Sequence, residues 1–224
     1  MGAGMMNWTL SSLAERCTVC KVETRRLPGQ RAGLTRARVL AAAKELLAEG
    51  RLEALTMRAL AERLGVSPNA IYSHVESKTA LIDDLLDELL AEVDAPDPRL
   101  ADPAAGLHAL MASTHAVLLS HPAMVPLYLA RQGARGPHAR RLGDIMLELL
   151  GRTGVTGPRA REALRVLIIY TIGFAAFVTR GPIEPDANPE PPAGELLDNF
   201  DAGLRWLIEA ITGSAPGSDT AAIG

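Results

Sequence analysis

The sequence predicts an all-α protein of about nine helices, in which an amino-terminal helix-turn-helix domain of three helices precedes a carboxy-terminal helical bundle. Apolar residues recur at the 3.6-residue spacing of an amphipathic helix from Val39 to Ile211. No segment shows a convincing strand-like alternation of apolar and polar residues. Residue types that begin or end helices, namely Ser, Thr, Gly and Pro, separate the periodic segments.

The first three helices are bounded by residues that favour helix ends. Thr35 begins the first helix and Gly50 ends it. The second runs from Thr56 to Gly65, whose missing side chain permits the left-handed backbone conformation of a tight turn. The third begins after Ser67, with a proline in its first turn, where an absent N–H loses no helical partner.

Longer helices follow in the rest of the chain. They are expected over residues 78–93, 103–120, 122–132, 138–151, 158–180 and 195–212. A Pro-rich loop over 181–194 separates the last two.

The predicted domains follow from this order of elements. Residues 1–32 show no sustained period and are interpreted as a flexible basic arm, with a short extra helix over Leu10–Val22 as the alternative. The helix-turn-helix domain is expected over 33–78, the ligand-binding and dimerisation domain over 79–213, and a disordered tail over 214–224.

The segment Met57–Glu76 has the pattern of a helix-turn-helix motif. Ala61 is small enough to let the second helix of the motif cross close to the first, and Val66 and Ile71 are expected to fill the space between them. The outward residues of the second helix are polar or short-chained, as a helix that enters the major groove can be. They are Ser67, Asn69, Ala70, Ser73 and His74.

The net charge of −3 hides an uneven distribution. Residues 1–78 contain 12 Lys and Arg against 7 Asp and Glu, whereas residues 79–224 contain 11 against 19. A basic amino-terminal segment on an acidic body suits a protein that binds nucleic acid at one end, although domains also differ in charge without binding DNA.

The run GVSPNAIYSHVESKTALIDDLL is similar to the DNA-binding domain of the TetR family of bacterial transcriptional repressors, and the strong match covers about Leu34–Leu90. The resemblance implies that Thr56 and Lys78 hold phosphates at helix starts and that the Tyr72 hydroxyl reaches another phosphate. It also places Asn69, Ala70 and Ser73 at base edges, with His74 beside them. Helix N-termini and a lysine favour phosphate on physical grounds as well.

Some of these assignments have a purely structural alternative. Tyr72 could pack against the first helix of the motif, and His74 could cover the core of the domain. Arg36, Arg38 and Arg58 are plausible contacts to the DNA backbone, although an arginine on a helix is usually only solvated.

The bundle contains the ingredients of an effector pocket, because adaptable and aromatic side chains share its helices with a few polar groups. The predicted lining is Leu107, Met111, Thr114, His115, Met124, Tyr128, Met146, Tyr170 and Phe174. The alternative for each of these residues is an ordinary place in the packed core.

The segment Val166–Val178 is apolar almost all round, which requires burial on several sides. We therefore expect a homodimer whose interface combines this helix with the last one, and the resemblance implies the same four-helix interface. The predicted interface residues are Val166, Gly173, Phe177, Leu204, Leu207 and Ile211.

Other function classes lack support in the sequence. Neither a catalytic constellation nor a cluster of metal ligands occurs at a suggestive spacing, so an enzyme, a cofactor and a metal are not expected. Cys17 and Cys20 are interpreted as two incidental thiols, because a lone CxxC lacks a second ligand pair. The longest apolar run has 13 residues, too short for the ~30 Å of a bilayer core, and a cytoplasmic protein is expected.

The function predicted from these observations is a ligand-responsive transcriptional regulator. It is expected to be a repressor that a small, mostly apolar effector releases from a palindromic operator. The alternative is a constitutive DNA-binding regulator without an effector. The identity of the effector and the operator sequence do not follow from the sequence.

Overall fold

The computed structural model describes residues 33–49, 55–180 and 192–213, and these residues contain helices and no strand. The helices are α1 (Arg36–Glu49), α2 (Met57–Leu64), α3 (Pro68–Tyr72), α4 (Lys78–Leu90), α5 (Pro103–Ser120), the 3-10 helix η2 (Pro122–Met124), α6 (Val125–Arg131), α7 (Pro137–Arg152), α8 (Gly157–Thr179) and α9 (Ala193–Gly213). The predicted all-α class is confirmed.

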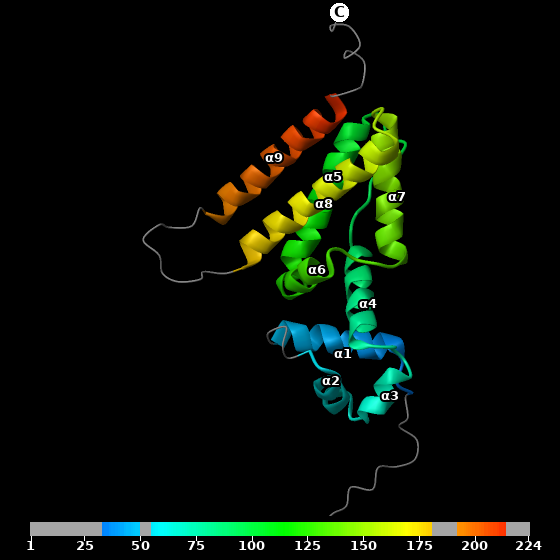
Figure 1. Ribbon diagram of the computed structural model, residues 1–224. Helices are drawn as coiled ribbons and strands as arrows, with labels where there is room; N and C mark the ends of the chain where they lie inside the picture. Colours follow the sequence, from blue (N-terminus) through cyan, green and yellow to red (C-terminus); the bar gives the residue numbers. More distant parts are fainter. Residues whose placement is uncertain (1–32, 50–54, 181–191, 214–224) are drawn as a thin grey trace, which may run out of the picture. The chain divides into compact units, whose positions relative to one another are not determined.

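Helices α1, α2 and α3 form a small cluster at the amino-terminal side of α4 (Figure 1). Their shared core contains Val39, Leu47, Leu60 and Ile71, all of which are almost fully buried. The Thr56 hydroxyl accepts a hydrogen bond from the Ala59 N–H at 3.1 Å, as the predicted start of α2 requires.

Helix α4 packs against α1 near one end and against α6 and α7 along the rest of its length (Figure 1). Leu81, Leu85 and Leu89 are fully or almost fully buried, as the expected apolar face of this helix requires. The helix begins at the predicted residue, because the Ser77 hydroxyl accepts a hydrogen bond from the Ala80 N–H. It ends at Leu90, three residues before the predicted Val93.

Helix α5 is the centre of the bundle and packs against α7, α8 and α9 (Figure 1). Its Leu107, Leu110 and Leu118 are completely buried. Asp102 begins the helix by accepting hydrogen bonds from the Ala104 and Ala105 N–H groups. The bounds of α5 agree with the predicted 103–120, and those of α7, α8 and α9 agree to within two residues.

The predicted helix over 122–132 is divided into η2 and α6. The described residues from Leu34 onward pack as one compact unit, so the division at residue 78 stays a prediction about function. The predictions for the arm at 1–32, the two cysteines, most of the Pro-rich loop and the tail at 214–224 lie outside the described residues.

Candidate functional site

The turn between α2 and α3 has the geometry of a helix-turn-helix. Gly65 adopts the left-handed conformation, with φ 65°, which a residue with a side chain rarely takes. The Val66 N–H donates to the Ala61 carbonyl at 3.0 Å and closes the end of α2. The turn therefore sets α3 against α2, with Ile71 fully buried between them.

The nine residues predicted to contact DNA are all accessible to a ligand. Seven are exposed: Thr56, Arg58, Ser67, Asn69, Tyr72, Ser73 and Lys78. Ala70 and His74 are half-buried. Tyr72 is 49% exposed, which argues against the alternative that its ring only packs against α2.

The cations of the first four helices divide into two groups by their partners. Arg36 is paired with Asp84, Lys44 with Glu88, and Arg63 with Glu45 and Glu49. Arg58 and Lys78, in contrast, form no ion pair with any residue that the structure describes.

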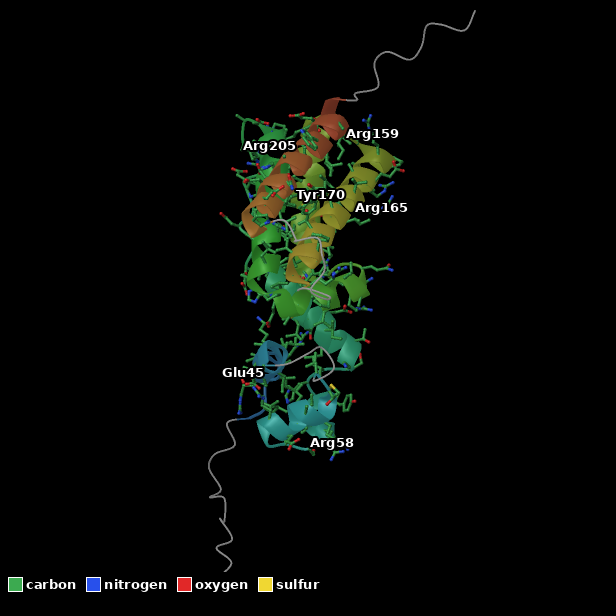
Figure 2. The ribbon with its side chains drawn as sticks, turned by 90° about the vertical axis from the view of Figure 1, so that its left-hand side faces the viewer. Glu45, Arg58, Arg159, Arg165, Tyr170 and Arg205 are labelled. Atoms are coloured by element: carbon green, nitrogen blue, oxygen red, sulfur yellow. The ribbon has the colours of Figure 1, made fainter. Side chains whose placement is uncertain are left out.

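The two cations without an ion pair among the described residues, Arg58 and Lys78, lie on the surface that surrounds α3. Figure 2 shows Arg58 projecting from α2 on the side away from α1. Lys78 occupies the first position of α4, where the helix dipole adds positive potential. The uncompensated positive charge therefore lies beside the exposed residues of α3.

Three details of this surface differ from the sequence-based expectation. Ser67 precedes α3 in an extended conformation, but its side chain makes no capping hydrogen bond. The Ser73 hydroxyl donates to the Ala70 carbonyl at 2.6 Å, which leaves only its lone pairs for a base or phosphate. Arg36 is bound to Asp84 of α4 and is not available as a backbone contact.

A cavity of about 860 Å³ lies among α5, α6, α7 and α8, within the size range of small-ligand sites. Of the predicted pocket residues, Met111, Thr114, Tyr128 and Met146 line this cavity. The segment between α6 and α7 forms another part of its wall through Gln132, Arg135 and Gly136, among others.

The other predicted pocket residues do not line this cavity: Leu107, His115, Met124, Tyr170 and Phe174. Leu107 and Met124 are buried in the core. The three rings belong instead to an aromatic cluster under α9, because each of them contacts Phe200. The centroids of the His115 and Phe200 rings lie 3.8 Å apart in a stacked arrangement.

Tyr170 connects α8 to α9 within this cluster, and Figure 2 shows it between the two helices. Its hydroxyl donates to the Phe200 carbonyl at 2.9 Å. Gly203 lies against the same hydroxyl, and a methyl group there would overlap it. Tyr170 and Phe174 therefore hold α9 in place.

His115 is 3% exposed, and its Nε2 atom has no hydrogen-bond partner among the described residues. Burial lowers the pKa of His115 to about 4, because the charged imidazolium would lose its hydration. His115 is therefore neutral near pH 7, and its ring acts as an apolar stacking partner for Phe200. The sequence could not distinguish this position from a cavity-facing one on the same helix.

Acidic residues of α4 connect this helix to elements on both sides of it. Asp84 and Glu88 pair with Arg36 and Lys44 of α1. On the other side, Asp83 accepts two hydrogen bonds of 2.8 Å from Arg131 at the end of α6. Sequence reasoning missed this set, since acidic residues on a helix ordinarily only face solvent.

Asp87 is the one acidic residue of α4 that is buried. Its carboxylate accepts hydrogen bonds from the Ala139 N–H at 2.9 Å and the His138 N–H at 3.3 Å, at the start of α7. Gly136 packs directly against this carboxylate with φ 152°. Asp87 thus joins α4 to α7 at the wall of the cavity, to which both Gly136 and Ala139 belong.

Helix α8 leaves an apolar stripe uncovered by its own chain. Val166, Ile169 and Phe177 are exposed, and Gly173 lies in the same stripe with open space beside it. Trp206 of α9 is 70% exposed.

Three predicted interface residues lie differently on α9. Leu204 is completely buried within its own chain, and Leu207 and Ile211 are half-buried against the core. The exposed side of α9 is marked by Trp206 instead, which is one residue before Leu207 and two after Leu204. Leu204 is corrected from an interface residue to a core residue.

Helix α8 is also the one described helix that is long and apolar enough to cross a membrane by length and composition alone. An 18-residue window within it has a mean hydropathy of 1.6, and 28% of that window is buried. The low burial of so apolar a helix agrees with a surface that another chain covers.

Comparison with known proteins identifies relatives of this chain. Residues 39–85 match the family model described as bacterial regulatory proteins, tetR family. An HTH-type transcriptional regulator of Saccharopolyspora erythraea is 32% identical over 143 residues, covering 62% of this chain and 59% of the relative. The class A tetracycline repressor protein from transposon 1721 of Escherichia coli is 33% identical over 144 residues, covering 60% of this chain and 62% of the repressor.

The chain thus spans about six tenths of the length of these curated relatives. A solved structure of a TetR variant from Acinetobacter baumannii in complex with minocycline is 28% identical to this chain, with a TM-score of 0.70. The match covers 83% of this chain and 100% of that one. The relatives are named as regulators or repressors, in agreement with the expectation that the chain is not an enzyme.

Proposed function

We propose that this chain, which belongs to the TetR family of bacterial regulatory proteins, is a cytoplasmic transcriptional repressor that binds a palindromic operator as a homodimer. A small, mostly apolar effector in the cavity between α5 and α8 releases the repressor from its operator. The observation that carries the proposal is the surface of α3, where exposed polar side chains lie beside Arg58 and Lys78, two cations that form no ion pair with any described residue.

The proposed DNA contacts follow from this surface. Asn69 and Ala70 present the short-chained side of α3 to base edges, and the exposed Asn69 side chain makes no hydrogen bond with any described residue. Lys78, the Tyr72 hydroxyl and the start of α2 at Thr56 hold phosphates. Phosphate contacts position the protein, and base contacts select the sequence.

Dimerisation supplies a second copy of the DNA-binding surface around α3. The exposed stripe of α8 and Trp206 on α9 would leave several large apolar side chains uncovered on a monomer. A two-fold dimer through these helices presents two copies of α3 to half-sites about 34–36 Å apart, or a multiple of that distance.

Effector control is proposed to act through α4. The cavity wall between α6 and α7 is fastened to α4 by the Arg131–Asp83 pair and by Asp87, while Asp84 fastens α4 to α1. A ligand that moves this wall displaces α4. The displacement changes the distance between the two copies of α3 in the dimer. Ligand and DNA then oppose each other reciprocally, typically by ~1–3 kcal/mol.

The test is selection of bound sequences from random duplex DNA, followed by affinity measurements on the selected operator. We expect an inverted repeat. Lys78→Ala should weaken binding to all sequences alike and reduce the slope of log affinity against log salt by about 1. Asn69→Ala should instead change which bases are tolerated at one position of each half-site.

A matched control is Arg161→Ala, which removes an exposed cation of α8 far along the chain from α3. It should leave both the affinity and the salt slope unchanged. Selection that yields no enriched sequence, or affinities that respond equally to all three substitutions, would contradict the assignment of α3 as the reading element.

A further inference from the structure

We infer that the effector is an anion: an apolar molecule that carries a carboxylate or a chemically similar acidic group, held by Arg140 of α7 and Arg165 of α8. The inference rests on the proposed function, because it assigns the chemical class of ligand to the same cavity. Two observations carry it: the charged side chains that line the cavity are all arginines, and two of these arginines have no partner among the described residues.

The charged residues lining the cavity are all of one sign. Among the described residues that form its wall, Arg135, Arg140 and Arg165 are cationic, and no Asp or Glu is present. Most of the remaining wall is apolar, with Ile168, Ile172 and other aliphatic side chains. A ligand with an apolar body and one negative group matches both parts of this lining.

Two of the three arginines have no partner among the described residues. The Arg135 side chain donates to the Arg131 carbonyl at 2.9 Å. Arg140 and Arg165 form no side-chain hydrogen bond or ion pair with any residue in the described part of the chain. They come from different helices, and Figure 2 shows Arg165 on α8. Each therefore retains all of its donors for a ligand.

Asp83 and Asp87 of α4 already bind groups at the end of α6 and the start of α7. Asp83 is bound to Arg131, and both oxygens of Asp87 accept backbone N–H groups at the start of α7. The positive charge at the cavity is therefore not neutralised by α4.

Two neutral hydrogen-bonding groups of the wall, Thr114 and Tyr128, offer less to a ligand than the arginines do. The Thr114 hydroxyl donates to the Leu110 carbonyl at 2.8 Å, so its proton is already used. Burial raises the pKa of Tyr128, which keeps its hydroxyl protonated near pH 7. The arginines are thus the groups of this wall that distinguish an anionic ligand from a neutral one of the same shape.

The experiment compares two fluorescent probes on the full-length protein. Anilinonaphthalene sulfonate is an aromatic anion, and phenylnaphthylamine is the same molecule without the sulfonate; both brighten in an apolar site. Dissociation constants are measured for the wild type and for the Arg140→Gln, Arg165→Gln double variant. For each probe, the dissociation constant of the variant is compared with that of the wild type, so the difference in hydrophobicity between the two probes cancels.

We expect the double variant to bind the anionic probe about tenfold more weakly, the loss of roughly one charge-assisted contact. The neutral probe should bind with unchanged affinity. The affinity of the anionic probe for the wild type should also fall with salt, whereas that of the double variant should fall less. Equal loss for both probes, or no loss for either, overturns the inference.

Two controls test whether the probes bind in the cavity and whether its arginines cause the loss of affinity. The matched double variant Arg141→Gln, Arg161→Gln removes exposed cations from the same two helices outside the cavity lining, and should leave both affinities unchanged. Gly143→Trp fills the cavity from α7, where an added Cβ meets no atom within 4 Å, and should abolish binding of both probes. Unchanged binding of the anion to Gly143→Trp places it elsewhere and overturns the inference.

The outcome is separable from that of the proposed function. If operator binding is intact but the Arg140→Gln, Arg165→Gln variant binds both probes as the wild type does, or loses both equally, the ligand class is refuted and a DNA-binding regulator remains. Failure to bind any selected DNA, together with Arg-dependent binding of the anionic probe, refutes the proposed function and retains the anion site.

Discussion

Replacement of Asp87 tests how α4 is joined to the bundle. Asp87→Ala removes the acceptor for the Ala139 and His138 N–H groups at the start of α7. Loss of a helix-capping side chain costs roughly 0.5–2 kcal/mol, and leaving a buried N–H without a partner costs about 1–3 kcal/mol. The longer bond of 3.3 Å is the weaker one. We expect a loss of about 2 kcal/mol in the free energy of unfolding.

The assay is urea unfolding at one fixed protein concentration, because the stability of a dimer depends on concentration. The midpoint should fall without a change in slope, and Tm should fall by about 4–8 °C. Asp144→Ala is the control: it removes an exposed carboxylate of α7 that has no described ion pair, and should stay within about 0.5 kcal/mol of the wild type. An unchanged midpoint for Asp87→Ala would refute the assignment of this carboxylate as the cap of α7.

Gly136 provides a second measurement of the same contact. A methyl group at Gly136 would overlap the Asp87 carboxylate, and φ 152° disfavours a side chain in any case. The free-energy cost of placing a side chain at φ 152° is the same in the wild type and in the Asp87→Ala variant. Gly136→Ala should therefore destabilise the wild type more than the Asp87→Ala variant, by about 1–3 kcal/mol in a double-mutant cycle. Additive effects would contradict the close packing of this pair.

Three further predictions concern other parts of the bundle. Trp206→Asp should convert the dimer, about twice 23.8 kDa by sedimentation, to a monomer at micromolar concentration, whereas Leu129→Asp, also on the surface, should not. His115 has a folded-state pKa of about 4, below its ordinary 6.5, so its contribution to stability is complete above pH 6.5 and is lost as the pH falls toward 4. His115→Phe should therefore unfold with a weaker dependence on pH in this window, by about 1–3 kcal/mol in urea titrations, and equal pH profiles would contradict its burial as a neutral ring. Gly203→Ala should destabilise the protein despite the better helix propensity of alanine, and Tyr170→Phe should relieve most of this cost; a loss of the same size in both backgrounds would show that the two residues are not in contact.

Local signals in the sequence determined the helices of this protein. Thr56, Gly65, Ser77 and the prolines act within one or two turns of their own position, so the starts and ends that they impose are readable without the fold. The 3.6-residue pattern likewise identified the apolar face of α4. The candidate DNA surface was predictable for the same reason, because its residues follow one another on α3 and at adjacent helix starts.

Relationships between distant helices were decided only by the tertiary structure. Periodicity places His115, Tyr170 and Phe174 toward the interior, but it cannot tell a cavity from an aromatic cluster, since both are apolar. The arginines of the cavity were not found, because each looks like a solvated residue until α7 and α8 are side by side. Leu204 and Trp206 differ by two positions, and only the packing of α9 on α5 and α8 decides which of them is buried.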